Sequence, residues 1–365
     1  MTKDKNAGWV TAADVARRAG VSRSAVSRTF TEGASVAPET RVKVLKAAEA
    51  LGYQVNMLAR SVIQQQSNLV GVVVAGFDNP FLMSLLGPLT HYLALRGLAP
   101  MLMDASEPEA LAKTLRRLLQ YRVAGAILTS GAPPIELAEE YLRLRIPVTM
   151  INREADLEGV DVINSDNRGG GALAARALLD SGARKLLFLN VASATYSARE
   201  RSEGFSRAVA SHVRRGEVSL RRSVATGSGY AGGFETARKL FAQSDDRPDG
   251  VFCVNDALAC GLIDGARQLF GLRVPQDLRV VGFDDIPMSS HAAYALTTVR
   301  QDVDSLARHA VTSLAERMAE PTMPTRSQQV PVSVMNRQST GANSKAASVS
   351  VTKAANVTPV AVRGR

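Results

Sequence analysis

The central part of the chain alternates short apolar runs with longer amphipathic stretches. Seven runs have the length of a β-strand and are rich in Val, Ile, Leu and Phe, at residues 69–76, 99–105, 124–130, 147–152, 185–191, 250–255 and 279–285. Helix-length segments lie between several of them, at 81–96, 109–122, 168–181 and 200–212. Near-continuous apolar strands separated by helices predict a parallel sheet that is covered on both faces. The pattern extends over more than 200 residues, which predicts two α/β subdomains.

Two short helices separated by Gly20 are predicted near the N-terminus. The first spans residues 12–19, with Thr11 as its N-cap and Asp14 three positions further on, which resembles a capping box. The second helix starts at Ser22, another residue type favoured at the N-cap. The residues after Ser22 give this second helix a polar outer face, and Ala16, Val21 and Val26 can form an apolar seam between the helices.

This pair of helices is typical of a helix-turn-helix, whose second helix enters the DNA major groove with its N-terminus first. Short hydroxylated and basic side chains suit that position because they reach phosphates and base edges. An ordinary helical hairpin with a polar second helix is the alternative interpretation. A third helix is predicted at 38–51, between Pro38 at its first position and Gly52 at its end. Four apolar residues on it are expected to close a three-helix core: Val42, Leu45, Ala48 and Leu51.

Residues 11–67 resemble the DNA-binding headpiece and hinge of the lactose/galactose repressor (LacI/GalR) family of bacterial transcriptional regulators. The family core VAxxAGVSxxxVSR is present in register as VARRAGVSRSAVSR. The resemblance implies a small all-α helix-turn-helix headpiece at 9–55 and a hinge helix or linker at 56–67. It also implies an α/β core at 68–336, made of two periplasmic-binding-protein-like subdomains with parallel sheets.

The resemblance also divides this core into two lobes that close on a small molecule. The first lobe is expected at about 68–165 plus 299–325, and the second at about 166–298 plus 326–336. Ligands in such α/β folds bind at the carboxyl ends of the strands.

The resemblance implies that nine residues contact double-stranded DNA: Thr11, Ser22, Arg23, Ser24, Ser27, Arg28, Asn56, Ala59 and Val62. Arg23 and Ser24 are best placed for base edges. Ser22 and Ser27 suit phosphates, and Arg28 suits a phosphate or a base.

The hinge departs from the family pattern at two positions. Val55 stands where the family has Pro, and Val62 stands where it has a Leu that wedges into the minor groove. Such a wedge unstacks a base step and kinks the duplex. Because Val is shorter than Leu, the sequence leaves open whether Val62 or Ile63 is the wedge.

Candidate effector-binding residues follow the predicted strands. In the family, the residues that match Arg201 and Asp284 hold the effector from opposite sides. The family alignment places further residues in or beside the pocket: Thr129, Asn152, Ser197, Asn255 and Gln301. Phe81 is a further candidate because it follows the first strand, in the family signature NPF. Amide, carboxylate and guanidinium groups recognise sugars and polyols, so a sugar, polyol or sugar acid is the expected effector. The alternative for an Asp after a strand is a helix N-cap, and this role is expected for Asp256 and Asp285.

The segment GSGYAGG contains a formal G-x-G-x-x-G, with glycines at 227, 229 and 232. A dinucleotide fingerprint should follow the first strand of a βαβ unit, and an acidic residue should stand at the end of the second strand. Asp249 instead precedes a strand, so the segment is interpreted as a rim of the effector site, with Tyr230 as a candidate lid. No cofactor is expected.

Charge is concentrated at the two ends of the chain. Residues 1–66 hold 10 Lys and Arg against five acids, and residues 321–365 hold six Lys and Arg and no acid. A basic arm on a near-neutral core suits DNA binding. Cys253 and Cys260 are expected to be buried free thiols, and no metal site is expected because the four His are scattered.

The tail at 337–365 is basic, contains no Leu and is expected to be disordered. Without a leucine-heptad tetramerisation helix, a homodimer assembled through the core is expected, which requires a pseudo-palindromic operator. No signal peptide or membrane span is predicted, so the location expected is the cytoplasm, at the nucleoid. A solute-binding protein and a sugar-modifying enzyme of the same α/β class are the alternatives. The headpiece opposes the first, and the lack of a nucleophile motif such as G-x-S-x-G opposes the second.

Overall fold

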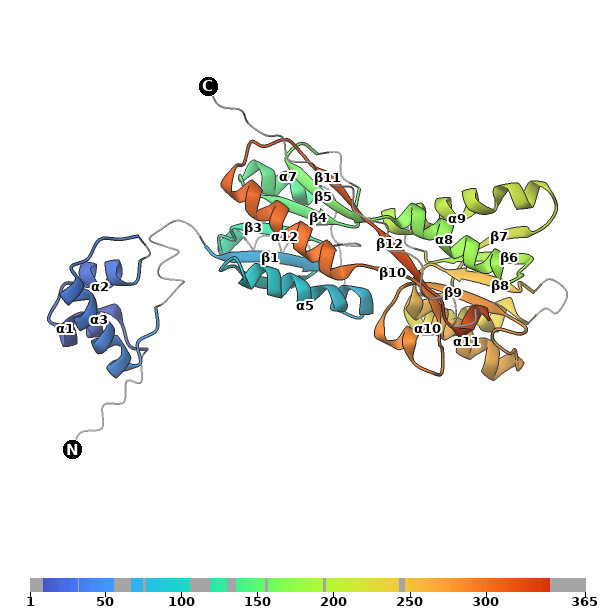
Figure 1. Cartoon of the computed structure of the whole chain (residues 1–365), viewed down its shortest axis with the longest axis horizontal. Helices are drawn as coiled ribbons and strands as arrows, with labels where there is room; N and C mark the ends of the chain where they lie inside the picture. The colour runs from blue at the N-terminus through green and yellow to red at the C-terminus, as the bar shows by residue number, and fades with distance from the viewer. Residues whose placement is uncertain are drawn as a thin grey trace, which may run out of the picture. The chain divides into compact units, whose positions relative to one another are not determined.

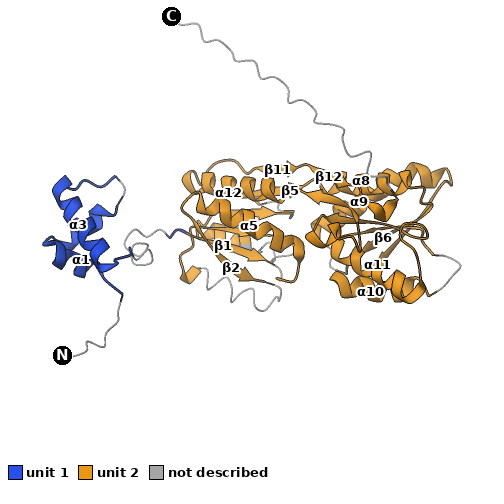
Figure 2. Ribbon diagram, turned by 60° about the horizontal axis from the view of Figure 1, so that its bottom comes forward, with its two compact units in different colours: residues 1–68 blue, residues 69–365 orange. Residues whose placement is uncertain are grey.

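The computed structural model describes residues 9–31, 33–55, 67–74, 77–105, 119–129, 136–154, 157–192, 195–242 and 247–341. The chain forms two compact units, Met1–Asn68 and Leu69–Arg365, which are blue and orange in Figure 2. No helix in these ranges is long and apolar enough to cross a membrane.

The smaller unit is built from three helices: α1 (Ala12–Ala19), α2 (Arg23–Thr29) and α3 (Pro38–Leu51). The predicted capping box is confirmed, because the Asp14 amide donates to Thr11 Oγ1 and the Thr11 amide donates to the Asp14 carboxylate. The Ser22 hydroxyl accepts from the Ala25 amide and begins α2 as predicted. Gly20 ends α1 with a φ of 67°, a conformation that favours glycine.

One part of the predicted three-helix core is wrong. Val42 and Leu45 are 65% and 46% exposed, whereas Val44, Ala47 and Ala48 are buried against α1 and α2. Positions 44, 47, 48 and 51 recur at helical spacing and share one side of α3, so Val42 lies on the opposite side. Several apolar residues follow each other in this helix, and spacing alone does not show which of them face inward.

The first sheet of the larger unit has the strand order β11-β5-β4-β3-β1-β2, and all its pairs are parallel. Its strands are β1 (Leu69–Val74), β2 (Ala99–Asp104), β3 (Gly125–Leu128), β4 (Val148–Ile151), β5 (Val160–Ser165) and β11 (Ser327–Val330). Two helices, α5 (Pro80–Ala94) and α12 (Val303–Ala319), share one apolar cluster with this sheet. A separate cluster joins the sheet to α7 (Glu136–Arg143).

The second sheet has the order β12-β10-β9-β8-β6-β7, and it is parallel except for β12. Its strands are β6 (Lys185–Asn190), β7 (Ser219–Val224), β8 (Gly250–Cys253), β9 (Arg279–Asp284), β10 (Thr297–Gln301) and β12 (Val332–Met335). In Figure 1, α8 (Asn167–Asp180) and α9 (Tyr196–Arg214) cover one face, and α10 (Gly229–Leu240) and α11 (Asp256–Phe270) cover the other. A short 3₁₀ helix, η1 (Pro287–Ser290), follows β9.

The chain crosses between the two sheets three times: from β5 to α8, from β10 to α12, and from β11 to β12. Figure 1 shows β11 and β12 as one nearly continuous ribbon that runs from the first sheet to the second. The lobe boundaries therefore differ from those expected. Residues 327–330 add to the edge of the first sheet beside β5, and residues 299–301 belong to β10 of the second sheet.

All seven predicted strands are present, but the pattern missed five others: β5, β7, β10, β11 and β12. These strands carry polar residues, as in SLRRSV of β7 and TTVRQ of β10, so they do not read as apolar runs. The tail also begins later than expected. A 3₁₀ turn, η2 (Gln338–Thr340), follows β12 with Ser339 buried, and the Ser339 hydroxyl donates to the Val280 carbonyl. Residues from 342 onward lie outside the described ranges, as does most of the helix expected at 109–122.

Candidate functional site

One side of α2 presents the polar residues that the sequence assigned to DNA contact. Arg23, Ser24, Ser27 and Arg28 are exposed, while Val26 and Thr29 on the other side of the helix are buried. The Ser22 hydroxyl, besides capping the helix, lies 2.8 Å from the Ser24 hydroxyl. Thr11 is also exposed, at the start of α1. This arrangement leaves two guanidinium groups and several hydroxyls on the surface of a short helix, as contact with a phosphate backbone and base edges requires.

The hinge residues of the sequence prediction, Asn56, Ala59 and Val62, lie outside the described residues, as does Ile63. Their roles stay predictions. Val55 is the last described residue before them.

In the larger unit, the two residues expected to hold the effector contact each other. Arg201 Nη2 lies 3.3 Å from Asp284 Oδ1, and both side chains are buried. Arg201 also donates from Nε to Asn167 Oδ1 at 2.9 Å and from Nη1 to the Val254 carbonyl at 2.7 Å. Its guanidinium lies 3.6 Å from the centre of the Phe283 ring, a distance at which a cation and an aromatic face attract.

Two glycines position Arg201 by letting α8 and α9 pack closely. A Cβ at Gly171 would come within 2.2 Å of the Arg201 carbonyl oxygen, and one at Gly204 within 1.9 Å of the Arg168 carbonyl oxygen. Any larger residue would therefore push the helices apart. The glycine run at 169–171 thus forms a closely packed start of α8.

Asp284 has an unusual backbone and an unusual acidity. Its φ is 117°, in a region that side-chain-bearing residues rarely occupy. Burial raises the pKa of the Asp284 carboxyl to about 6, against the lowering effects of Arg201 and Gln301. A second buried acid, Asp256, contributes to the same cluster of charges, and burial followed by repulsion from Asp284 raises its pKa well above the ordinary value. Two carboxyl groups thus share the vicinity of one guanidinium.

Gln301 joins this cluster to the first sheet. Its Nε2 donates to Asp284 Oδ1 at 2.7 Å, and its Oε1 accepts from Asn152 Nδ2 at 2.8 Å and from Ser165 Oγ at 2.6 Å. Ser197 donates to the Asn152 carbonyl at 3.3 Å. The structure therefore brings together five predicted residues at the carboxyl ends of the strands: Asn152, Ser197, Arg201, Asp284 and Gln301.

The other four predicted effector residues make different contacts. Asn255 uses its side chain to cap α11, by accepting from the Leu258 amide at 2.9 Å. Tyr230 donates to Asp264 at 2.7 Å. Thr129 is buried and donates to the Val73 carbonyl, and Phe81 packs in the apolar cluster beneath α5.

The N-cap role predicted for Asp256 and Asp285 is wrong. The cap of α11 is Asn255, and the Asp256 carboxylate instead accepts from Thr298 Oγ1 and from the Ile286 amide. Asp285 pairs with Arg300 and Arg337, each at 2.6 Å. The Asp256 carboxylate is thus taken by groups on neighbouring segments, and the Asp285 carboxylate by two arginines, so neither caps the start of a helix.

Two residues of the network were missed by the sequence reasoning: Ser165 and Asn167. Ser165 is the last residue of β5, and Asn167 comes two positions after it. The sequence of β5, VDVINS, mixes apolar and polar residues, so the pattern did not predict a strand there. With β5 identified, the position of SDN at its carboxyl end would have been the signal.

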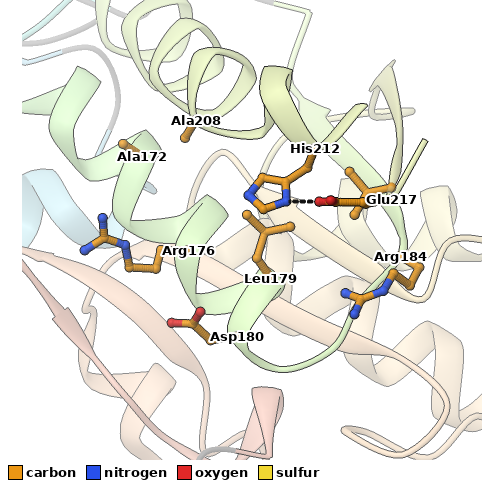
Figure 3. A pocket seen from close by; sticks show the side chains of 9 residues that line it. Ala172, Arg176, Leu179, Asp180, Arg184, Ala208, His212 and Glu217 are labelled. Atoms are coloured by element: carbon orange, nitrogen blue, oxygen red, sulfur yellow. Dashed lines mark hydrogen bonds and ion pairs between the residues drawn. The ribbon is translucent and has the colours of Figure 1, made fainter. Parts of the chain in front are cut away.

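An open pocket of about 620 Å³ lies between α8 and α9 and is separate from this network. Figure 3 shows that most of its lining comes from α8, α9 and the segment before β7. A hydrogen bond joins His212 to Glu217 there. None of the predicted site residues lines it. Within the described ranges, no group of three or more His, Cys, Asp or Glu could hold a metal ion.

Comparisons with known proteins match both units. Residues 11–56 match the family described as bacterial regulatory proteins, lacI family, and residues 175–340 match a periplasmic binding protein-like domain. The chain is 30% identical over 332 residues to the ribose operon repressor of Escherichia coli K12, covering 89% of this chain and 98% of that protein. It is also 30% identical over 312 residues to the transcriptional repressor PurR of Mannheimia succiniciproducens, covering 84% and 91%.

Solved structures agree with these relatives. A lac repressor dimer bound to operator and the anti-inducer ONPF is similar with a TM-score of 0.80 and 26% identity, covering 92% of this chain and all of that one. A LacI-family regulator from Enterococcus faecium with bound ribose is similar with a TM-score of 0.66 and 25% identity, covering 74% and 98%.

Proposed function

The chain belongs to the LacI family of bacterial regulatory proteins as a DNA-binding repressor, and we propose that a small carbohydrate-like molecule bound between its two lobes controls its affinity for DNA. The resemblance to this family is thereby confirmed, with the headpiece match at residues 11–56, and so is the expected fold class. The relatives are transcriptional repressors, which excludes the alternative of a sugar-modifying enzyme.

The polar side of α2 supports operator binding by the smaller unit. Arg23 and Ser24 read base edges, Ser22 and Ser27 fix the helix on the phosphates, and Arg28 contacts a phosphate or a base. The protein acts as a homodimer, so the operator is a pseudo-palindrome with one half-site for each headpiece. A similar solved structure is that of a repressor dimer on its operator, which supports this part of the proposal.

The buried pair of Arg201 and Asp284 is the observation that carries the effector proposal. A guanidinium and a carboxylate at the carboxyl ends of parallel strands, beside the amides of Asn152 and Gln301, match the hydroxyl groups of a sugar or polyol. A similar regulator has ribose bound, and a similar repressor belongs to a ribose operon. We therefore propose that a sugar, polyol or sugar acid binds beside Arg201, Asp284 and Asn152.

Control of DNA affinity follows from two arrangements of the dimer that differ in how the lobes approach each other. The effector shifts the balance between them only by its difference in affinity for the two arrangements. The three crossovers between the sheets are the segments that must bend when the lobes move.

Thermal unfolding against a panel of sugars, polyols, sugar acids and nucleotides tests the effector, because a ligand of the folded state raises Tm. D-ribose is the first probe. A rise with a sugar that is absent in Arg201→Gln supports the proposal, and a rise with nucleotides alone would overturn it. Operator binding is tested by selection from random duplexes, with Arg214→Ala as a control because this exposed arginine ends α9, far along the chain from α2. Recovery of a half-site without two-fold symmetry would contradict the dimer.

A further inference from the structure

Five buried side chains form a closed ring of polar contacts where the chain crosses between the two sheets: Asn152, Gln301, Asp284, Arg201 and Asn167. Asn152 donates to Gln301, Gln301 and Arg201 both contact Asp284 Oδ1, and Arg201 donates to Asn167. Asn167 Nδ2 closes the ring at 3.5 Å from Asn152 Oδ1, the longest of these contacts. Buried polar networks of this kind are rigid when every member has a partner.

The direction of each hydrogen bond around Gln301 is fixed from outside the ring. The Ser165 amide can only donate, and it donates to Asn152 Oδ1 at 2.8 Å, so the Asn152 amide group faces Gln301. Gln301 must then present its oxygen to Asn152 and its Nε2 to Asp284, which as a carboxylate can only accept. The same oxygen also accepts from Ser165, so three of the four hydrogen-bonding positions of the Gln301 amide are already used inside the protein.

The side chain of Gln301 also connects the two lobes. Gln301 is the last residue of β10 in the second sheet, and its two donors belong to the first lobe: Asn152 directly follows β4, and Ser165 ends β5. Gln301 therefore contacts both the first lobe and the carboxylate of Asp284 through hydrogen bonds.

From this geometry we infer that Gln301 is a positioning residue of the effector site, which holds Asp284 ionised and oriented and links it to the first lobe through Asn152 and Ser165. The inference rests on the effector role proposed above for Asp284 and Arg201. It assigns Gln301 a role through Asp284, in place of the direct pocket contact expected from the sequence.

The charged groups around Asp284 make this role measurable. Arg201 faces it from α9, and Asp256 faces it from the start of α11. Asp285, the next residue along the chain, is held by Arg300 and Arg337. Among these groups, Arg201 and the Gln301 amide are the partners that lower the Asp284 pKa, and burial opposes them. Removal of the Gln301 donor should therefore raise the pKa of Asp284 further above about 6.

Three variants separate this role from a general effect on packing. Gln301→Leu removes both functions of the amide with little change in size. Gln301→Glu keeps the acceptor for Asn152 and Ser165, and it can donate to Asp284 only while the new carboxyl holds a proton. Gln329→Leu is the matched control, because Gln329 is exposed on β11 and donates to another carboxylate, that of Asp166, at 3.3 Å.

The first measurement needs no ligand. The stability of the full-length protein is measured from pH 4 to 8 for the wild type, Gln301→Leu, Gln329→Leu and Asp284→Asn. The loss of stability that accompanies ionisation of Asp284 should run from about pH 4 to about pH 6 in the wild type and in the control, and should extend to higher pH in Gln301→Leu. It should be absent in Asp284→Asn. An unchanged upper pH limit of this loss in Gln301→Leu would overturn the inference.

The second measurement is calorimetric titration with D-ribose, or with the sugar that gives the largest Tm rise in the panel. Gln301→Leu should weaken binding about tenfold at pH 7, as expected for a lost hydrogen bond to a charged group. Gln301→Glu should recover part of this affinity as the pH falls to about 6. The loss of affinity in Asp284→Asn is compared with the loss in the double variant that also carries Gln301→Leu. Equal losses show that Gln301 acts through Asp284, and additive losses would refute it. If no probe binds the wild type, the effector proposal fails, while the pH measurement still decides the role of Gln301.

Discussion

Replacement of Asp284 by Asn should stabilise the protein above pH 6, although it removes a residue of the proposed effector site. The Asp284 carboxyl is buried, and its pKa of about 6 shows that the fold favours the neutral form even with Arg201 beside it. Asn has nearly the same shape and is never ionised. Arg201 keeps its contacts with Asn167, the Val254 carbonyl and the Phe283 ring, and it keeps Asp256 as a nearby acid.

The magnitude follows from the difference between the folded and unfolded pKa values. A rise from 3.8 to about 6 is a change of about two pKa units, which corresponds to about 3 kcal/mol of folding free energy. Because the folded pKa is the higher one, the wild type has its full stability below pH 4 and loses this amount as the pH rises through 6. Asp284→Asn should therefore match the wild type near pH 4 and exceed it by up to about 3 kcal/mol at pH 8.

Urea unfolding at pH 4, 6 and 8 measures the effect directly, with Asp285→Asn as the neighbouring control. Asp285 is held by Arg300 and Arg337, which lower its pKa, so its replacement should destabilise the protein at pH 8. Opposite signs for two adjacent aspartates would be hard to explain by a general change in packing. If Asp284→Asn were less stable than the wild type at pH 8, attraction to Arg201 would outweigh the cost of burying the charge, and the reasoning would be refuted.

Three further predictions concern the rest of the molecule. Asp161→Asn should cost about 3–5 kcal/mol in urea unfolding at pH 7 because it leaves the buried Arg317 without the carboxylate that it contacts at 2.6 Å, and no loss would refute the need for this ion pair. Arg28→Ala should weaken operator binding and lower the slope of log K against log salt by about one if the side chain contacts a phosphate, whereas an unchanged slope with altered base preference would assign it to a base. Val62→Leu should tighten operator binding at fixed salt by restoring a larger wedge, and a titration that shows equal or weaker binding would remove the wedge role from this residue.

The parts of the fold that were predictable depend on local physical rules. The capping box at Thr11 and Asp14 and the cap at Ser22 involve residues three positions apart, so the sequence contains the whole interaction. The seven apolar strands are likewise local, because burial on both faces requires apolar residues throughout. These rules do not extend to edge strands such as β7 and β11, whose pairing partners are distant in sequence and whose exposed residues are polar.

The site was predictable in part because its residues follow strands, but its contacts were not. Arg201 and Asp284 were assigned by resemblance to opposite sides of a ligand, and in the structure they bind each other. The Tyr230 hydroxyl donates to Asp264, which also accepts from Tyr294, a residue 30 positions further along the chain. Which of several possible partners a side chain takes depends on the competition among distant segments, and no pattern in the sequence reports that competition.

Backbone conformation gives an independent reason to place the function where β4 and β9 end. Six described non-glycine residues have a positive φ, and Asn152, Asp284 and Asp285 are three of them. Each such residue costs on the order of 1–3 kcal/mol unless its surroundings hold it. At Asn152 and Asp284 the side chains are held by the ring through Gln301, so the strain and the polar network depend on each other. Glycine would remove this backbone strain at Asn152 and Asp284, but it would also remove the side chains that form the ring. The effector proposal accounts for Asn and Asp at these positions, because it requires their side chains to bind the effector.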